Sequence, residues 1–457
     1  MQKRDIYTFF IFFILPILSF SQTDTNSILN AFKQGVTSGY FRAYGMTTDN
    51  ASNYKDFGAV AVGGKLKYET AKWNRFSIGA AMYVSANTGL TDMTERDETT
   101  QRLSRYELGL FNNLDPAQRE IVLLGEAYLK YSSKKSELTM GRMLLKTPFL
   151  NPQDGRMIPT LEQGIWFKNQ SLKHYTFQAG VLNAIAPRST NRFFSIEHSM
   201  GTYPVGRNPT GAASGYQGNT NTDFMAIGSV KGKYKHVEWQ AWNYYLDNVF
   251  NTGYLLVKGD KELNANYQWL WGAQYIRQDK VGNGGNDRAE LSYFDQSNSN
   301  VYGLQTGLKR KGYQLMFSGN HVDDAGRFLF PREWGRETLF TFQKRERTEG
   351  QSNATNLLVE VSKKHLLESG AVIDWKVGWG RYWWQDVLNP EDNKYAIPEH
   401  DQINVDIFYH FSGVLKGLKS EFLVSWKPNN GETYGNPNFI VNKVDMAVYQ
   451  VILNYEF

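Results

Sequence analysis

The sequence predicts an all-β fold, a transmembrane antiparallel β-barrel of about 18 strands with short periplasmic turns and long extracellular loops. Three observations predict it: the chain ends on an amphipathic strand, the same alternation recurs upstream, and short and long connections alternate. Composition agrees, because the chain is 15% aromatic but only 41% hydrophobic. Strands with one apolar and one polar face produce both properties at once.

The last segment, from Asp445 to Phe457, gives the clearest pattern. Residues two apart in a strand share a face, and here every second residue is apolar. These residues are Ala447, Tyr449, Val451, Leu453, Tyr455 and Phe457. A chain that ends on Phe after such a run is similar to the C-terminal signal of bacterial outer-membrane barrels, so Phe457 is the expected contact for the barrel-assembly machinery. The alternative is the last strand of a secreted β-sandwich.

The other strands follow from the same two-residue period. In chain order they are expected near residues 38–44, 59–69, 76–85, 122–131, 137–144, 164–168, 174–181, 222–231, 236–246, 253–258, 266–277, 301–309, 313–320, 356–362, 371–379, 400–411, 418–426 and 443–457. Connections after even-numbered strands are short, whereas most of those after odd-numbered strands are long. This sorting is expected of a transmembrane barrel, which must close because hydrocarbon cannot satisfy an open edge. A barrel of about 18 strands is wide enough for an aqueous channel.

The N-terminus has the features of a secretory signal over residues 1–21. Lys3 and Arg4 precede the apolar stretch 6–18, and Ser19-Phe20-Ser21 fits a cleavage site. A single N-terminal membrane anchor is the alternative, but the stretch is short and Pro16 interrupts it. The barrel is expected to use residues 22–457. Export limits the compartment to the periplasm, the outer membrane or the medium, and the barrel pattern favours the outer membrane.

Composition and motifs exclude several function classes. The chain has no Cys, which removes thiolate catalysis and Cys-ligated metal centres. Its formal charge of +5 is too small to indicate nucleic-acid binding. Hydrolase, zinc-protease, phosphate-binding and dinucleotide-binding motifs are absent, and the seven His are scattered. We therefore expect no enzyme activity and no cofactor or metal.

Several stretches resemble the OprD family of outer-membrane porins. They are Gly39–Tyr44, Gly63-Gly64 with Tyr68–Thr70, Leu124–Leu129, Gly141-Arg142, Thr147-Pro148, Arg156–Pro159 and Ser412–Leu418. The resemblance covers the first third and the last tenth of the chain, and the middle (185–350) does not align. It implies an 18-stranded, substrate-selective channel narrowed by an inward-folded loop, with cationic side chains on the wall. Members of that family favour small carboxylate-bearing nutrients, including basic amino acids and aromatic acids.

Five residues are candidates for the pore lining or constriction. Arg42 shares a strand face with Tyr40 and Tyr44, and a guanidinium in lipid is costly, so it should point into the lumen. Arg142 ends the fifth predicted strand, and Arg156 lies inside the expected constriction loop 145–163. Either arginine would bind a solute carboxylate or brace the loop to the wall. Asp154 and Glu162 are candidates for attracting a solute ammonium.

The loop 321–355 mixes several Arg with Asp and Glu, which favours a solvated external loop; a second wall of the constriction is the alternative. The function expected is a passive porin in contact with outer-membrane lipid and small solutes, as a monomer or weak trimer. Two rivals remain open: a secreted carbohydrate-binding β-protein, and an outer-membrane barrel lipase.

Overall fold

The computed structural model describes residue 25 and residues 27–152 and 156–457. The expected signal segment 1–21 and the candidate Asp154 lie outside the described residues. The strands are β1 (Val36–Asp49), β2 (Phe57–Glu69), β3 (Phe76–Asn87), β4 (Glu120–Ser132), β5 (Ser136–Met143), β6 (Leu161–Asn169), β7 (Tyr175–Ala186), β8 (Phe194–Ser195), β9 (Met225–Tyr234), β10 (Val237–Leu246), β11 (Phe250–Asn264), β12 (Tyr267–Lys280), β13 (Asn298–Arg310), β14 (Tyr313–Val322), β15 (Ala354–Leu366), β16 (Val372–Trp383), β17 (His400–His410), β18 (Leu418–Lys427) and β19 (Met446–Glu456).

Helices are few and short. They are α1 (Ile28–Lys33), α2 (Ile196–Ser199) and α3 (Pro437–Ile440), with single 3-10 turns at Leu108–Leu110, Ala289–Leu291 and Gly413–Leu415. Within the described ranges, no helix has both the length and the apolar character needed to cross a membrane.

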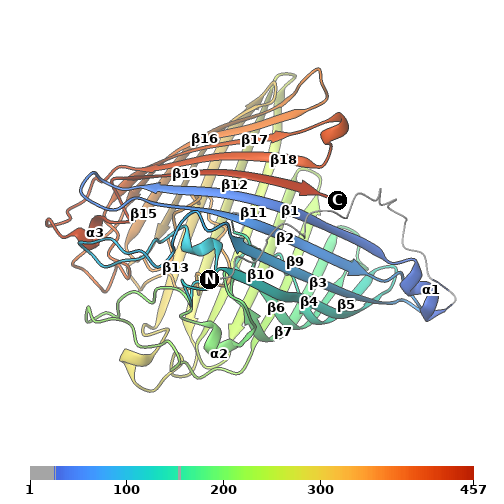
Figure 1. Ribbon diagram of the computed structural model, residues 1–457, viewed down its shortest axis with the longest axis horizontal. Coiled ribbons are helices and arrows are strands. Elements are labelled where there is room, and N and C mark those ends of the chain that lie inside the picture. Colours follow the sequence, from blue (N-terminus) through green and yellow to red (C-terminus); the bar gives the residue numbers. More distant parts are fainter. Residues whose placement is uncertain (1–24, 26, 153–155) are drawn as a thin grey trace, which may run out of the picture.

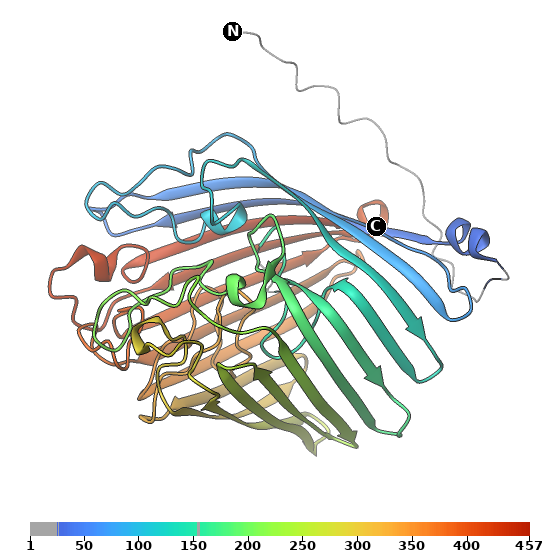
Figure 2. The same cartoon turned by 90° about the horizontal axis from the view of Figure 1, so that it is seen from below.

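The strands form one closed antiparallel barrel (Figures 1 and 2). Nearly every strand pairs with its neighbours in sequence, and β1 pairs with β19 from Tyr40↔Glu456 to Asp49↔Ala447. β8 has only two residues and pairs with the C-terminal end of β7, and the rest of β7 pairs directly with β9. The remaining eighteen strands make the wall, so the predicted architecture is confirmed.

The two ends of the barrel differ in the length of their connections. In Figure 1 the short turns lie at the end near α1, and the long loops gather at the end near α3. The turn between β13 and β14 has only Lys311 (φ 48°) and Gly312 (φ 83°), and positive φ at both positions is what a tight hairpin requires. Long connections include residues 88–119, 144–160 and 323–353. The predicted alternation of short turns and long loops is confirmed.

The wall has an apolar outer face and a mixed inner face. On β19 the outward Val451 and Leu453 are 51% and 44% exposed, whereas the inward Ile452 is 2% exposed. A row of exposed aliphatic side chains is unfavourable in water and favourable against lipid. The apolar stripe that predicted the terminal strand is therefore the membrane-facing side of the barrel.

The largest buried cluster lies inside the barrel, towards the end that carries the long loops. Two of these loops fold into the lumen and contribute its centre, including Phe149 from residues 144–160 and Phe328 and Trp334 from residues 323–353. They pack against inward side chains of the wall such as Tyr244 and Tyr254. The barrel is therefore narrowed by its own loops, and the path left between them and the wall is the candidate functional site.

Candidate pore constriction

Loop 323–353 folds into the barrel, so the expectation of a solvated external loop is wrong and the alternative of a second constriction wall is correct. Arg327, Phe328 and Trp334 are each at most 2% exposed. Its charges are compensated by protein groups, because Arg332 Nε lies 2.9 Å from Glu349 and Arg347 Nη1 lies 2.7 Å from Glu337. Alternating charges in a sequence do not show whether their partner is water or another side chain.

The deepest part of this loop, residues 338–346, lies across the inner wall as a belt. It begins at β12, where Gln274 donates to the Thr338 carbonyl at 3.2 Å and accepts from the Phe340 N–H at 2.8 Å. It reaches β16, where the Tyr382 hydroxyl bonds to Gln343 at 3.0 Å. The belt therefore passes from β12 to β16 across the strands that lie between them.

The second half of the belt continues to the seam where the barrel closes. The Lys344 ammonium lies 3.1 Å from Asp406 on β17 and also pairs with Glu421 on β18. Arg345 donates to the Tyr44 hydroxyl of β1 at 2.6 Å and to Gln450 of β19. Together the two halves attach the belt to about half of the barrel circumference.

Glycines on the inner wall make room for the belt. A Cβ on Gly272 would lie 2.9 Å from the Phe340 ring, and one on Gly380 would lie 2.1 Å from the Gln343 amide oxygen. Both contacts are closer than side chains tolerate, so the belt lies against bare backbone at these positions. Glycine within a strand commonly marks such a close approach.

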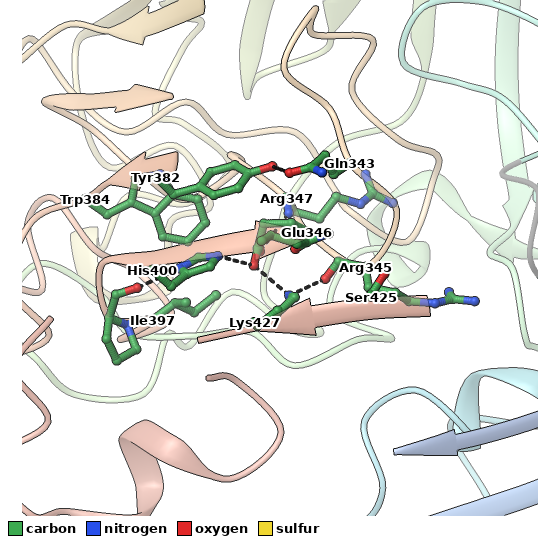
Figure 3. Close-up of polar contacts among 12 residues, drawn as sticks. Gln343, Arg345, Glu346, Arg347, Tyr382, Trp384, Ile397, His400, Ser425 and Lys427 are labelled. Carbon is green, nitrogen blue, oxygen red and sulfur yellow. Dashed lines mark hydrogen bonds and ion pairs between the residues drawn. The ribbon is translucent and has the colours of Figure 1, made fainter. Parts of the chain in front are cut away.

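A buried ionic cluster anchors the belt at Glu346 (Figure 3). The Glu346 carboxylate lies 2.7 Å from Lys427 Nζ and 3.0 Å from His400 Nε2. His400 Nδ1 lies 2.8 Å from the Pro398 carbonyl oxygen, so both ring nitrogens face oxygen atoms. Burial would raise the pKa of Glu346, but Lys427 and then His400 outweigh it and hold that pKa well below its usual range.

The second inward loop, residues 144–160, packs directly on loop 323–353. Asn151 accepts from the Arg336 N–H at 3.1 Å and donates to the Arg336 carbonyl at 2.9 Å. A Cβ on Gly335 would lie 2.1 Å from the Phe149 carbonyl oxygen, so the two backbones touch there. The contacts fix the two loops as one unit across the lumen.

Arginines gather where these loops meet β1, and we call Arg42, Arg156, Arg188 and Arg345 the arginine cluster. Arg42 donates through Nε to Asn454 at 2.6 Å and through Nη1 to the Arg156 carbonyl. Arg188 donates to the Arg332 carbonyl. These acceptors are uncharged, as are Tyr44 and Gln450 opposite Arg345, so the contacts hold the guanidinium groups without neutralising them.

The charges of these arginines influence the pKa values of two neighbouring groups. Burial, and next the Arg345 charge, lower the pKa of Arg156. Burial would raise the pKa of the Tyr203 hydroxyl, yet Arg188 and then Arg156 outweigh it, so that pKa is lowered. Concentrated positive charge favours an anion in the same space.

The predicted site residues lie in different environments in the structure. Arg42 lies on the inner face and Arg156 lies in the arginine cluster, 8% exposed. Arg142 is a correction: it pairs with Ala127 on the face of the exposed Met140, so it points outward and does not line the pore. There it bonds to Gln163 at 3.2 Å and to the Leu124 carbonyl at 3.3 Å.

Glu162 is also a correction, because it is fully buried and accepts the Leu145 N–H at 3.0 Å, which leaves it inaccessible to a solute. Arg188 and Arg345 were not among the site residues predicted from the sequence. Arg188 lies in the stretch without alignable motifs, and Arg345 was assigned to an external loop. Within the described ranges no group of three or more acidic or His side chains is placed to hold a metal ion.

Solved structures share this fold over nearly the whole chain. OccAB4 of Acinetobacter baumannii superposes with a TM-score of 0.70 at 16% identity, covering 94% of this chain and 99% of that one. OccK9 (OpdG) of Pseudomonas aeruginosa has a TM-score of 0.70 at 14% identity, covering 94% and 99%. OpdK of Pseudomonas aeruginosa, solved with vanillate, has a TM-score of 0.67 at 12% identity, covering 93% and 99%.

A search among curated proteins found no match. The sequence profile of the OprD family of outer-membrane porins, in contrast, matches residues 97–351. That segment includes loop 144–160, all but the last two residues of loop 323–353, and Arg156, Arg188 and Arg345 of the arginine cluster. It is more than half of the chain, and the barrel around it has the same architecture. The chain therefore belongs to the OprD family of outer-membrane porins.

Proposed function

We propose that this porin is a passive diffusion channel for small solutes that carry a carboxylate, such as amino acids and small organic acids. The observation that carries the proposal is the arginine cluster, in which Arg42 and Arg345 are partly exposed and held by uncharged acceptors. A carboxylate passing these groups forms charge-assisted and often bidentate hydrogen bonds. OpdK, a structural neighbour, was solved with vanillate, which supports a solute of this class.

In this mechanism the solute binds weakly and successively to several groups along the path, and no single site holds it tightly. Fixed guanidinium groups replace part of the water around the carboxylate, and the solute leaves because no single contact is strong in a hydrated lumen. Loops 144–160 and 323–353 set the width of the path. We assign the chain no catalytic step.

The same proposal covers export and assembly. Residues 1–21 would be removed on export, and residues 22–457 would form the barrel in a Gram-negative type outer membrane, as a monomer or weak trimer. Phe457 stands at the free end of β19, where its N–H donates to the Gly39 carbonyl at 3.1 Å. We expect the barrel-assembly machinery to recognise this residue.

The test is ion selectivity of residues 22–457 refolded into a planar bilayer, measured as the reversal potential in a KCl gradient. Arg42→Ala should lower the preference for anions about fivefold, because one unit charge a few ångströms from the path is worth about 1 kcal/mol in a screened, hydrated lumen. Block by benzoate should weaken in parallel.

Arg142→Ala is the matched control, because the Arg142 side chain lies on the outer face and should leave the reversal potential unchanged. An open Arg42→Ala channel with the parent selectivity would contradict the proposed role of the cluster.

A further inference from the structure

A cavity of about 540 Å³ lies directly below the belt, on the periplasmic side of the lumen. The belt covers it with Leu339, Phe340 and Phe342. The wall of β12, β14 and β15 lines it with Leu270, Met316 and Leu358. Arg42 and Arg345 of the arginine cluster make their contacts with the wall at β19 and β1. The cavity is therefore a different part of the channel from the arginine cluster.

The belt side of this cavity is apolar, whereas most of the groups that line the rest of it are polar or charged. Phe340 and Phe342 are only partly buried, and both rings contribute to the cavity surface. Partly exposed aromatic side chains in water-filled space cost free energy unless an apolar group covers them. Aromatic side chains beside polar groups that fix the orientation of a ligand are a common feature of small-molecule sites.

Several of the charged groups that line the cavity form ion pairs. Lys376 Nζ lies 3.1 Å from Glu360, and Lys258 Nζ lies 3.4 Å from Glu238. A solute with a single charge must compete with one member of such a pair. A zwitterion, in contrast, offers an ammonium to the carboxylate and a carboxylate to the ammonium, so neither member loses its partner.

We propose that this cavity is a second solute site, which binds zwitterions with a large apolar side chain. The side chain would pack under Phe340 and Phe342, and the amino-acid head group would lie against the Glu360–Lys376 pair. A free amino acid such as L-phenylalanine or L-leucine has this shape and charge. The site depends on the arginine cluster only in that the solute must reach the lumen, so binding is measurable without transport.

The experiment is isothermal titration of the full barrel in detergent with four probes. L-phenylalanine carries ring, carboxylate and ammonium; 3-phenylpropionate lacks the ammonium, phenethylamine lacks the carboxylate, and L-alanine lacks the ring. L-phenylalanine should bind about tenfold more tightly than each of the others, because each lacks one group that the cavity contacts. Equal affinity for L-phenylalanine and L-alanine would overturn the proposal.

Two variants locate the binding. Phe340→Ala with Phe342→Ala should weaken L-phenylalanine binding about tenfold, and parent-like resistance of residues 323–353 to trypsin shows that the belt is still in place. Glu360→Gln with Lys376→Gln leaves the belt untouched; it should bring L-phenylalanine and 3-phenylpropionate to similar affinities. Phe317→Ala, on the outer face of β14, is the control and should not change the affinity for L-phenylalanine.

If L-phenylalanine binds to both double variants as it does to the parent chain, the proposal is wrong. The reversal potential of these variants should stay that of the parent, so failure here is distinct from failure of the proposed carboxylate selectivity.

Discussion

At the residue scale, the strand face decides what an arginine can do. The parity of β1 predicted that Arg42 points into the lumen, and the structure places it there. The same rule was available for Arg142, because Leu138, Met140 and Arg142 share one face and the first two are apolar. Resemblance had placed Arg142 at the constriction, whereas the side chain lies outside and satisfies a β4 carbonyl where β5 has ended. Position in a motif gave the wrong orientation, and period-two parity gives the right one.

Removal of the Glu346 charge should release the belt. Glu346→Gln leaves Lys427 and the His400 ring buried without an anion, and the loss of one partner in a buried ion pair costs about 3–5 kcal/mol. We expect noisier single-channel current and faster tryptic cleavage within residues 323–353. Lys376→Gln is the control, because the Lys376 side chain is about half exposed beside Glu360, and it should leave both signals near the parent level.

The same cluster predicts how the channel responds to pH. The pKa of Glu346 is depressed in the folded protein, so its contribution is complete above the unfolded value of about 4.3 and is lost only as pH falls towards the folded value. Current recorded from pH 7 to pH 5 should therefore show no change in belt noise, and noise should rise in stronger acid. A Glu346→Gln channel should be noisy throughout. A parent channel that becomes noisy between pH 7 and pH 5 would show that another group controls the belt.

At the element scale, the strands were predictable and the loops were not. Alternation is a local property, so β14 and β15 could be placed within a few residues from their own sequence. The path of the segment between them depends on partners such as Gln274, Asp406 and Tyr44, which are far away in the chain. One signal was present in the sequence: glycines at inward strand positions, such as Gly272 and Gly380, indicate that another segment packs close against the strand.

The contact between the two inward loops should set pore width. In Gly335→Ala the new Cβ would meet the Phe149 carbonyl oxygen at 2.1 Å, and backbone cannot give way as a flexible side chain does. We expect the loops to separate, with a higher single-channel conductance and weaker solute block. Gly228→Ala is the control, since a Cβ there meets nothing within 4 Å. Equal conductance for both variants would show that the loops yield without opening the path.

At the scale of the whole molecule, fold class and family followed from properties that span the chain. The apolar outer stripe of β19 and the sorting of short turns from long loops were sufficient for a closed barrel. The rival interpretations as a secreted carbohydrate-binding protein or a barrel lipase receive no support from the family or the solved structures. The sequence did not predict the arrangement inside the barrel, because the position of each arginine depends on how the two inward loops and the segment after β7 that carries Arg188 fold against one another.

Replacement of Phe457 should reduce assembly of the barrel in cells more than it reduces the stability of the folded barrel. The Phe457 ring lies 5.4 Å from the Phe41 ring, and its backbone bonds to Gly39. Phe457→Ala keeps the backbone bonds, so heat resistance of the barrel refolded in detergent should change by only a few degrees, which corresponds to about 1 kcal/mol. In cells, the amount of protein in the outer-membrane fraction should fall several-fold if the machinery reads this residue. An unchanged amount in cells would argue against that recognition.

The attachment of the belt also fixes an order of events during folding. Lys344 and Arg345 bind groups on β17, β18, β19 and β1, and these come from both ends of the chain. Their binding surface does not exist until the first and last strands have paired, so the belt docks after the wall has closed. Until the belt docks, the newly closed barrel lacks this part of its constriction and the groups that Lys344 and Arg345 bind remain without those partners. A belt variant with normal selectivity at equilibrium should therefore still differ from the parent chain in the time that refolded channels take to reach their final conductance.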